Sequence, residues 1–154
     1  MDNDCSQTSE NLSLVEWALA VNPSTPSHIL DGLLRHERPA LLERIAEHPQ
    51  ASANALTVLS QHQCPTVRAA VAENLNTPQQ IVFDLAQDQC LDVRYSIAEN
   101  PHMPLVVLDM LADDDNPYVA NRARLTIRRV QHVPRMPVPL PELDEIKVYE
   151  EGIG

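Results

Sequence analysis

The sequence repeats itself every 26 residues, and so short a period leaves few folds open to it. A motif close to Ala-Glu-Asn-Pro recurs without insertion or deletion, and its four copies occupy residues 20–23, 46–49, 72–75 and 98–101. Prolines recur in register with this motif, at Pro39, Pro65 and Pro117. A fixed period of about 20 to 50 residues is typical of solenoids, propellers and repeat arrays. We therefore expect one structural unit in each 26 residues.

Apolar residues fall in the same columns of every copy, with the spacing of a helix. One stripe has the spacing i, i+1, i+4 and consists of Ile29, Leu30 and Leu33, Ala55, Leu56 and Leu59, Ile81, Val82 and Leu85, and Val107, Leu108 and Leu111. A second stripe has the spacing i, i+4 and consists of Val15 and Leu19, Leu41 and Ile45, Val67 and Val71, and Val93 and Ile97. Such spacing places apolar residues on one face of an α-helix. Each repeat is therefore predicted to form two short helices.

Local chemistry predicts where these helices begin and end. Thr77 can cap a helix whose first residue is Pro78, and Gln80 completes a Thr-x-x-Gln capping box. Thr25-Pro26 repeats the cap without the box. The other helix should stop at the column of Asn22, His48, Asn74 and Asn100, because proline follows three of the four. The expected helices span residues 14–21, 26–34, 39–47, 52–60, 65–73, 78–86, 91–99, 104–112 and 117–131.

The balance of glycine and proline supports helices over sheets. The chain has 3 glycines and 13 prolines, and aromatic residues make up 3% of it, which disfavours strands joined by tight hairpins. We predict an all-α fold, an α-solenoid of about 4.5 repeats of paired short helices. The expected domains are a flexible N-terminal segment at 1–13, a helical repeat domain at 14–131 and a proline-rich acidic tail at 132–154.

One repeated string resembles the bacterial leucine-rich repeat variant (LRV) family. It reads Val-Arg-x-x-Val-Ala-x-Asn-x-x-Thr-Pro at 67–78 and returns in weaker form at 93–104, and the resemblance covers about residues 14–130. It implies a right-handed superhelix in which the second helix of each repeat is often 3₁₀, although the longer units here are also HEAT-like. Some members bind an iron–sulfur centre through an N-terminal cysteine cluster. This chain has only Cys5 there, and four thiolates are usual, so no cofactor is expected.

The formal net charge of -11 narrows the range of partners. Nucleic-acid binding through a basic face is unfavourable, and a basic protein partner is favoured. No stretch near the N-terminus joins a basic start to an apolar run, and no apolar run approaches the roughly 20 residues that cross a bilayer. An odd number of cysteines, three, suits a reducing compartment. Together with the family resemblance, these observations predict a bacterial cytoplasmic protein.

Cys64 and Cys90 occupy equivalent positions in consecutive repeats, as do His36 and His62. These four side chains could line one edge of the stack and hold a metal. Helical layers lie about 8–10 Å apart, however, which exceeds the reach of a disulfide and suits a single tetrahedral ion poorly. We favour small buried loop cysteines and expect no metal. A metal or redox protein that uses Cys5, Cys64 and Cys90 is an alternative.

The sequence does not indicate catalysis, because it shows neither a nucleophile with its base nor a convergent pair of carboxylates. The chain is therefore expected not to be an enzyme. Solvated helix ends explain a ladder of glutamates, which consists of Glu47, Glu73 and Glu99. Arg68 and Arg94 are expected to be structural and to tie carbonyls or acidic loop residues such as Asp88 between repeats.

In the second helix of each repeat, the positions outside the apolar stripe should face solvent. The residues at these positions become more apolar along the chain. The first copy has His28, Asp31 and Gly32 there, whereas later copies have Val58, Phe83, Val106 and Met110. An exposed apolar patch often marks an interface. We predict a partner-binding face that consists of Thr57, Val58, Phe83, Asp84, Val106, Asp109 and Met110. The apolar residues of the tail, Val138, Leu140, Leu143, Ile146 and Val148, could instead cover it.

The last predicted helix and the start of the tail hold five of the eleven basic residues, Arg122, Arg124, Arg128, Arg129 and Arg135. A terminal repeat needs a polar outer face, which explains this cluster as a cap. The functional alternative is a patch that binds nucleic acid or another anion. The leading prediction is a non-enzymatic adaptor or regulator that binds another protein through its concave helical face. The identity of that partner and the oligomeric state are open at this point.

Overall fold

The computed structural model describes residues 14–132, and this part of the chain is all-helical, as predicted. The described residues form nine α-helices and no strand. The helices are α1 (Leu14–Val21), α2 (Ser27–Leu33), α3 (Pro39–Ala46), α4 (Ala53–Leu59), α5 (Pro65–Glu73), α6 (Gln79–Leu85), α7 (Leu91–Glu99), α8 (Leu105–Leu111) and α9 (Pro117–Gln131). The predicted N-terminal segment and nearly all of the predicted tail lie outside the described residues.

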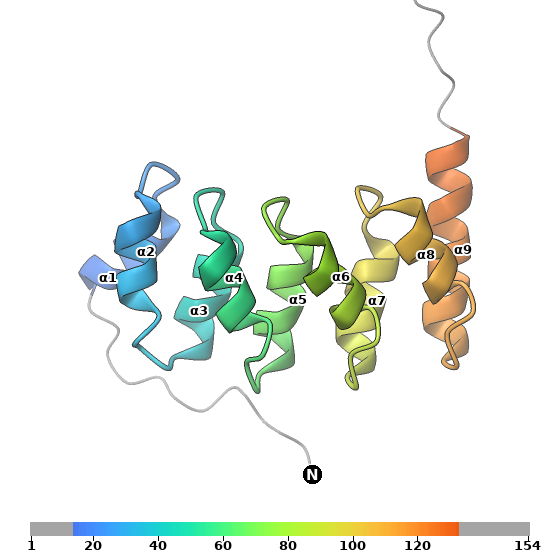
Figure 1. Cartoon of the computed structure of the whole chain (residues 1–154), viewed down its shortest axis with the longest axis horizontal. Coiled ribbons are helices and arrows are strands. Elements are labelled where there is room, and N and C mark those ends of the chain that lie inside the picture. The colour runs from blue at the N-terminus through green and yellow to red at the C-terminus, as the bar shows by residue number, and fades with distance from the viewer. Residues whose placement is uncertain (1–13, 133–154) are drawn as a thin grey trace, which may run out of the picture.

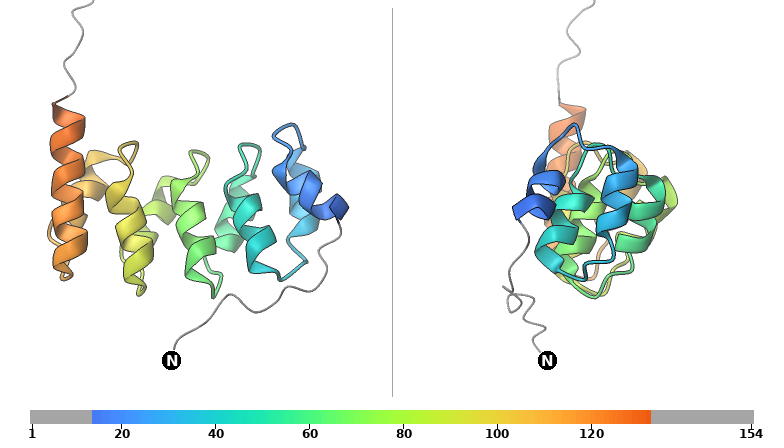
Figure 2. Two further views of the ribbon diagram at one scale, coloured as in Figure 1. Left: turned by 180° about the vertical axis from the view of Figure 1, so that it is seen from behind. Right: turned by 90° about the vertical axis from the view of Figure 1, so that its left-hand side faces the viewer.

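The helices stand in a single row of layers, which makes the described chain an α-solenoid (Figure 1). Each of the first four layers pairs an odd-numbered helix with the even-numbered helix that follows it, and α9 forms the fifth. The odd-numbered helices pack on one another from α1 to α9, whereas the even-numbered helices contact mainly the odd-numbered helices beside them. Figure 2 shows the row from behind and along its axis. The even-numbered helices therefore form a separate face of the molecule.

Every helix begins and ends within one residue of the sequence prediction. Proline occupies the first turn of α3, α5 and α9, where its missing N–H has no intrahelical partner to lose. The even-numbered helices begin one residue later and end one residue earlier than expected. They are α-helical throughout, so the 3₁₀ alternative that the family resemblance left open is not observed in them.

The expected threonine caps are also wrong. Pro78 itself, in an extended conformation, takes the N-cap position of α6, so Thr77 lies one residue outside it. The Thr77 hydroxyl donates instead to the carbonyl of Val71 near the end of α5, and Thr25 does the same to Leu19 at 2.7 Å. The last carbonyls of a helix lack intrahelical donors, and these hydroxyls supply them. Each threonine thus completes the preceding helix.

His48 and Asn74, the residues that follow α3 and α5 at the end of the repeated motif, also join neighbouring layers. The Nδ1 atom of His48 accepts the backbone N–H of Gln50 at 3.0 Å, so Nε2 carries the proton and donates to the carbonyl of Asn22 at 2.7 Å. The side-chain amide of Asn74 donates to the carbonyls of Ala46 at 2.6 Å and His48 at 3.0 Å. The repeated motif therefore encodes contacts between layers as well as helix ends.

The predicted apolar stripes form most of the core, although Leu19, Ile29 and Ile81 are half-buried and one residue, Val15, is exposed. In the second, third and fourth layers the second stripe is fully buried, at Leu41, Ile45, Val67, Val71, Val93 and Ile97. The i+1 and i+4 columns of the first stripe are buried in all four layers, from Leu30 and Leu33 to Leu108 and Leu111. Val15 is the exception, because 65% of its surface is exposed. Its column is covered in every later layer but not in the first.

Candidate functional site

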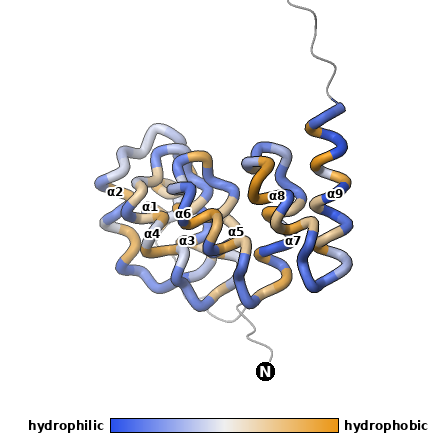
Figure 3. Tube along the Cα trace, turned by 45° about the vertical axis from the view of Figure 1, so that its right-hand side comes forward, coloured by the Kyte–Doolittle hydropathy of each residue, from blue (hydrophilic) through white to orange (hydrophobic). Residues whose placement is uncertain are grey.

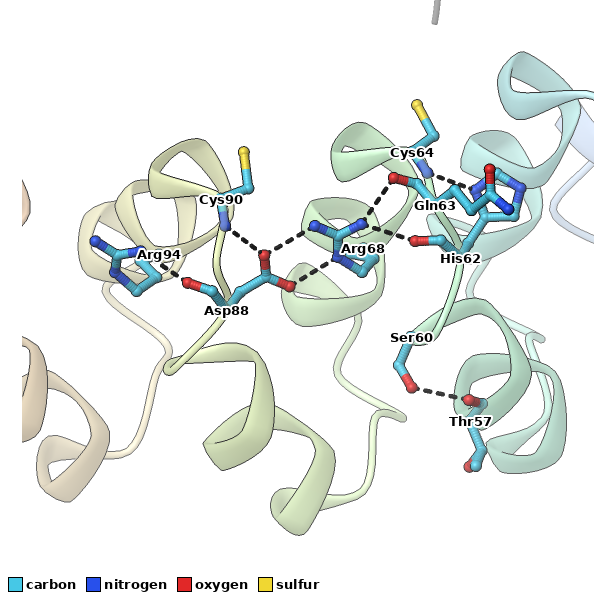
Figure 4. A network of polar contacts seen from close by, with 9 residues as sticks. All are labelled: Thr57, Ser60, His62, Gln63, Cys64, Arg68, Asp88, Cys90 and Arg94. Carbon is cyan, nitrogen blue, oxygen red and sulfur yellow. Dashed lines mark hydrogen bonds and ion pairs between the residues drawn. The ribbon is translucent and has the colours of Figure 1, made fainter. Parts of the chain in front are cut away.

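An arginine in each of two layers makes a buried ion pair with an aspartate in the loop that leads from its own layer to the following one. Arg68 on α5 donates from Nε and Nη2 to the two carboxylate oxygens of Asp88, at 2.7 and 2.8 Å. Its Nη1 donates to the carbonyls of His62 at 2.7 Å and Gln63 at 3.0 Å (Figure 4). All three guanidinium nitrogens therefore have acceptors. The structural role that we predicted for this arginine is confirmed.

The same arrangement recurs one layer on. Arg94 on α7 donates to Asp114 from Nε at 2.7 Å and from Nη2 at 3.2 Å, and its Nη1 donates to the carbonyl of Asp88 at 2.7 Å. Each of the two carboxylates also accepts a backbone N–H two residues ahead, from Cys90 and from Asn116. The carboxylate thus holds its own loop and the neighbouring layer at the same time.

In the first two layers, other residues occupy the positions of the arginine and the aspartate. In the first layer the equivalent pair is Glu16 and His36, whose side chains approach to 3.1 Å. In the second layer the equivalent positions are Leu42 and His62. His62 still accepts the N–H of Cys64 through Nδ1, as the aspartates do in later layers. Burial, together with the nearby Arg68 guanidinium, lowers the pKa of His62 and favours its neutral form.

The ion pairs also set the ionisation of the two aspartates. Burial alone would raise the pKa of Asp88 and of Asp114. Hydrogen bonds from Arg68 and the Cys90 N–H outweigh burial at Asp88, and those from Arg94 and the Asn116 N–H do so at Asp114. The pKa of each carboxyl therefore lies below its ordinary value. Both side chains are more than nine-tenths buried.

These lowered pKa values predict a loss of stability in acid. A carboxyl group with a lowered pKa in the folded state stabilises the fold fully at pH values above its unfolded pKa, which is near 3.8 here. It loses that contribution as the pH falls through its folded pKa. We expect the difference in free energy of unfolding between the wild type and Asp114→Asn to shrink as pH is lowered from about 5 to about 2, because the loss begins near the ordinary pKa of the carboxyl and continues through its lower folded pKa. Urea titrations at several pH values measure it. A difference that stays constant over this window would contradict the prediction.

A groove opens between layers beside each arginine. One, of about 420 Å³, is lined by Ser60–Gln63, Arg68, Asp84, Leu85 and Gln87–Gln89. The next, of about 340 Å³, is lined by Ala86–Asp88, Arg94, Met110, Leu111 and Asp113–Asp115. Because Arg94 is already paired with Asp114, the second groove keeps an excess of negative charge. These grooves border the face of the even-numbered helices.

The structure exposes most of the predicted partner-binding face. Val58 and Val106 are exposed over 63% and 55% of their surface, and Thr57, Asp84 and Asp109 are exposed as well. The other two predicted residues differ. Phe83 and Met110 are half-buried and pack against the core. Their expected full exposure is wrong, because a helical wheel of one helix does not include the neighbouring layer.

Leu105 extends this surface, and our sequence analysis missed it. It is 43% exposed and precedes Val106 at the start of α8. Its column holds Ser27, Ala53 and Gln79 in earlier copies, so the internal alignment contained the signal. Figure 3 shows hydrophobic residues gathered along α8. The exposed apolar surface of this face is therefore greatest in the fourth layer.

The even-numbered helices carry neither lysine nor arginine, and His28 on α2 is their one histidine. Their sequences contain Asp31, Asp84 and Asp109. Asp113 and Asp115, both exposed, follow α8. This face, which we call the even-helix face, combines exposed valine and leucine side chains with exposed carboxylates, of which Asp113 lies 3.9 Å from Arg124.

The predicted basic cluster on α9 is partly neutralised. Arg122 forms an ion pair with Glu99 at 2.8 Å, and Arg124 lies 3.9 Å from Asp113. Arg129 donates to the carbonyl of Glu99 at 3.4 Å, while Arg128 is exposed in the last turn of the helix. Arg135 lies outside the described residues. The carboxylates beside this cluster disfavour its use for nucleic acid or another anion.

The remaining candidates have structural surroundings. Cys64 is buried, with its sulfur 3.3 Å from the Thr66 hydroxyl, and Cys90 is half-buried, whereas Cys5 lies outside the described residues. Within residues 14–132 no group of three or more metal-ligating side chains comes together. The glutamate ladder is solvent-exposed as predicted, at Glu47, Glu73 and Glu99.

No protein-family model, curated protein or solved structure matches this chain. Among the described helices, none combines the length and the apolar character needed to cross a membrane. The case for a function therefore depends on the geometry of the solenoid and its surface.

Proposed function

We propose that this chain is a non-enzymatic scaffold that binds a basic, partly apolar segment of another protein on its even-helix face. The observation that carries this proposal is the combination of exposed Val58, Leu105 and Val106 with several exposed aspartates and no basic side chain on the same helices. Apolar anchors surrounded by a charged rim are typical of protein interfaces.

The two kinds of residue have different roles in the proposed interface. Val106 and Leu105 would lose water on contact and supply most of the affinity. Asp84, Asp109 and Asp113 would attract lysine or arginine side chains, accelerate association and disfavour acidic proteins. A partner segment therefore needs both apolar and basic side chains. We also propose, from the string at 67–78, membership of the leucine-rich repeat variant family and a bacterial cytoplasmic setting.

The test begins with the purified chain as bait in an extract of its source cell. Each recovered protein is then purified and titrated against the chain by calorimetry. We expect Val106→Ser and Asp109→Lys each to weaken binding by roughly tenfold or more, because the first removes an apolar anchor and the second reverses a rim charge. Rising salt should weaken the wild-type complex as well.

The matched control is Glu47→Lys, which reverses an exposed charge at the C-cap of the odd-numbered helix α3. It should leave the affinity unchanged. Equal binding by the wild type and both even-helix variants would place the interface elsewhere. Salt-dependent binding of DNA or RNA that Arg128→Ser abolishes would replace the proposal by the nucleic-acid alternative.

A further inference from the structure

The last described helix, α9, differs from all the others in charge. It carries four arginines and no acidic residue, whereas each of the other described helices is neutral or negative. Two of the four arginines have a carboxylate nearby, as described above. Within residues 14–132, no carboxylate pairs with Arg128 or Arg129, and both side chains are exposed. In a chain with a net charge of -11, α9 is thus an isolated basic surface.

Leu125 lies among these arginines and departs from the repeat. Its column is exposed in every layer, and the three layers before it carry glutamate there, at Glu47, Glu73 and Glu99. Leu125 is 47% exposed. Residues three and four positions away are its neighbours on the helix surface, and these are Asn121, Arg122, Arg128 and Arg129. A polar cap does not require this leucine, so a ring of arginines around an apolar centre needs another explanation.

The segment at 142–151, which we call the acidic segment, has the complementary composition. It holds five acidic residues and one lysine. Leu143 and Ile146 stand three residues apart in it, and Glu142, Asp144 and Glu145 lie beside them in sequence. Apolar side chains among carboxylates match a leucine among guanidinium groups in both hydropathy and charge. Composition therefore makes this segment a suitable occupant for the surface around Leu125.

The connection between α9 and the acidic segment is long enough for such a contact. Leu125 lies seven residues before His132, which is about 10 Å along a helix axis. The residues at 133–142 span up to about 31 Å in the polyproline II conformation that their prolines favour. Because the segment is attached to α9, its effective concentration there is on the order of millimolar, and weak contacts suffice.

Other surfaces of the described chain suit the acidic segment less well. The even-helix face offers apolar side chains, but the exposed carboxylates of Asp84, Asp109 and Asp113 would repel those of the segment. The exposed apolar residues of α1 lie four layers away from α9, which is about 32 to 40 Å at the usual layer spacing. That distance exceeds the reach of the connection. Charge and reach both favour α9.

We propose that the acidic segment folds back on α9, with Leu143 and Ile146 against Leu125 and the neighbouring carboxylates paired with Arg128 and Arg129. The contact neutralises the only described helix with an excess of positive charge, so that α9 no longer offers a free basic surface to nucleic acid. The even-helix face stays accessible. The contact is independent of the function proposed above, because it involves neither Val106 nor the aspartates of that face.

The test follows the backbone dynamics of the full chain by nitrogen-15 relaxation. We expect amide order parameters at 143–148 well above about 0.6, the value below which a backbone is flexible. We also expect a nuclear Overhauser contact between the methyl groups of Ile146 and Leu125. The order parameters should not change when the sample is diluted, because the contact lies within one chain.

Leu125→Glu is the variant of choice, because three earlier layers carry glutamate in this column and the fold accepts it. We expect it to lower the order parameters at 143–148 below about 0.6, since it replaces the apolar centre by a charge that repels the segment. Arg128→Glu is a second variant, which reverses one of the pairing charges. Leu105→Glu is the matched control, because Leu105 is 43% exposed but lies on the even-helix face, and it should leave the segment ordered.

Four results would overturn the proposal. The first is a wild-type segment whose order parameters already lie below about 0.6 at low salt. The second is a segment that stays ordered in both Leu125→Glu and Arg128→Glu while their circular dichroism is unchanged. The third is release of the segment by Leu105→Glu, which would assign it to the even-helix face. The fourth is a loss of order on dilution, which would assign the contact to a second copy.

Discussion

Replacing Ile97 by alanine should lower the free energy of unfolding by about 3 to 4 kcal/mol, the largest effect that we expect from a single core substitution. Ile97 is fully buried on α7, which packs between α5 and α9. Alanine would leave a cavity that two neighbouring layers line. A solenoid layer contacts only its neighbours, so weakening the fourth layer also weakens the connection of α9 to the remainder.

Denaturation by urea, followed by circular dichroism, measures this loss. Val106→Ala is the control, because it removes apolar carbons from a side chain that is more than half exposed, and it should change stability by well under 1 kcal/mol. A loss below 1 kcal/mol for Ile97→Ala would mean that the layers repack around the cavity. Two successive transitions in the circular dichroism signal would show that the layers do not unfold as a single unit.

Replacing Arg68 by methionine should cost about 2 to 3 kcal/mol, which is at the lower edge of the values for broken buried ion pairs because some solvent reaches the site. The guanidinium and the Asp88 carboxylate are 15% and 9% exposed, and methionine keeps the length of the side chain without its hydrogen bonds. Asp88 would then retain a buried charge without its cation, and the carbonyls of His62 and Gln63 would lose a donor.

A double-mutant cycle with Asp88→Asn isolates the interaction between the two side chains. The control is Arg44→Met, because Arg44 and Glu47 also form an ion pair but are about 40% exposed, and exposed pairs contribute less than about 1 kcal/mol. Similar losses of stability for Arg68→Met and Arg44→Met would refute the expectation that the buried ion pair contributes more than the exposed one. A coupling near zero in the cycle would assign the effect of Arg68 to its bonds with the carbonyls.

The repeat made most of the fold predictable from sequence, because each copy reports on the others. Val71 and Ile97 could be placed in the core since their columns are apolar at helical spacing in every copy. Arg68 and Asp88 could be matched because both the arginine and an acid in the loop at the end of its repeat recur 26 residues later, as Arg94 and Asp114. Thr77 was misassigned because its hydroxyl can either cap the following helix or donate to an unsatisfied carbonyl of the preceding helix. Sequence rules for helix ends consider only the cap.

The surface was less predictable, because exposure depends on what packs against a column. Val15 belongs to a core stripe by its spacing, yet it is exposed because no described layer precedes it. Phe83 occupies a position that one helix would expose, but the core covers half of it. Leu105 lies outside both stripes and could have been found only by comparing its column with the earlier copies. Periodicity describes the interior of a stack and says little about its ends and sides.

The column of paired residues has a consequence for how such an array can change in length. Arg68 and Arg94 meet aspartates in the loop at the end of their own repeat, so duplication of the module at 65–90 would supply a new arginine together with its aspartate. The array could lengthen there without an unmatched charge. Duplication of the module at 39–64 would instead repeat Leu42 and His62 and add no ionic link. The third and fourth layers are thus interchangeable modules, whereas the first two form a fixed leading segment.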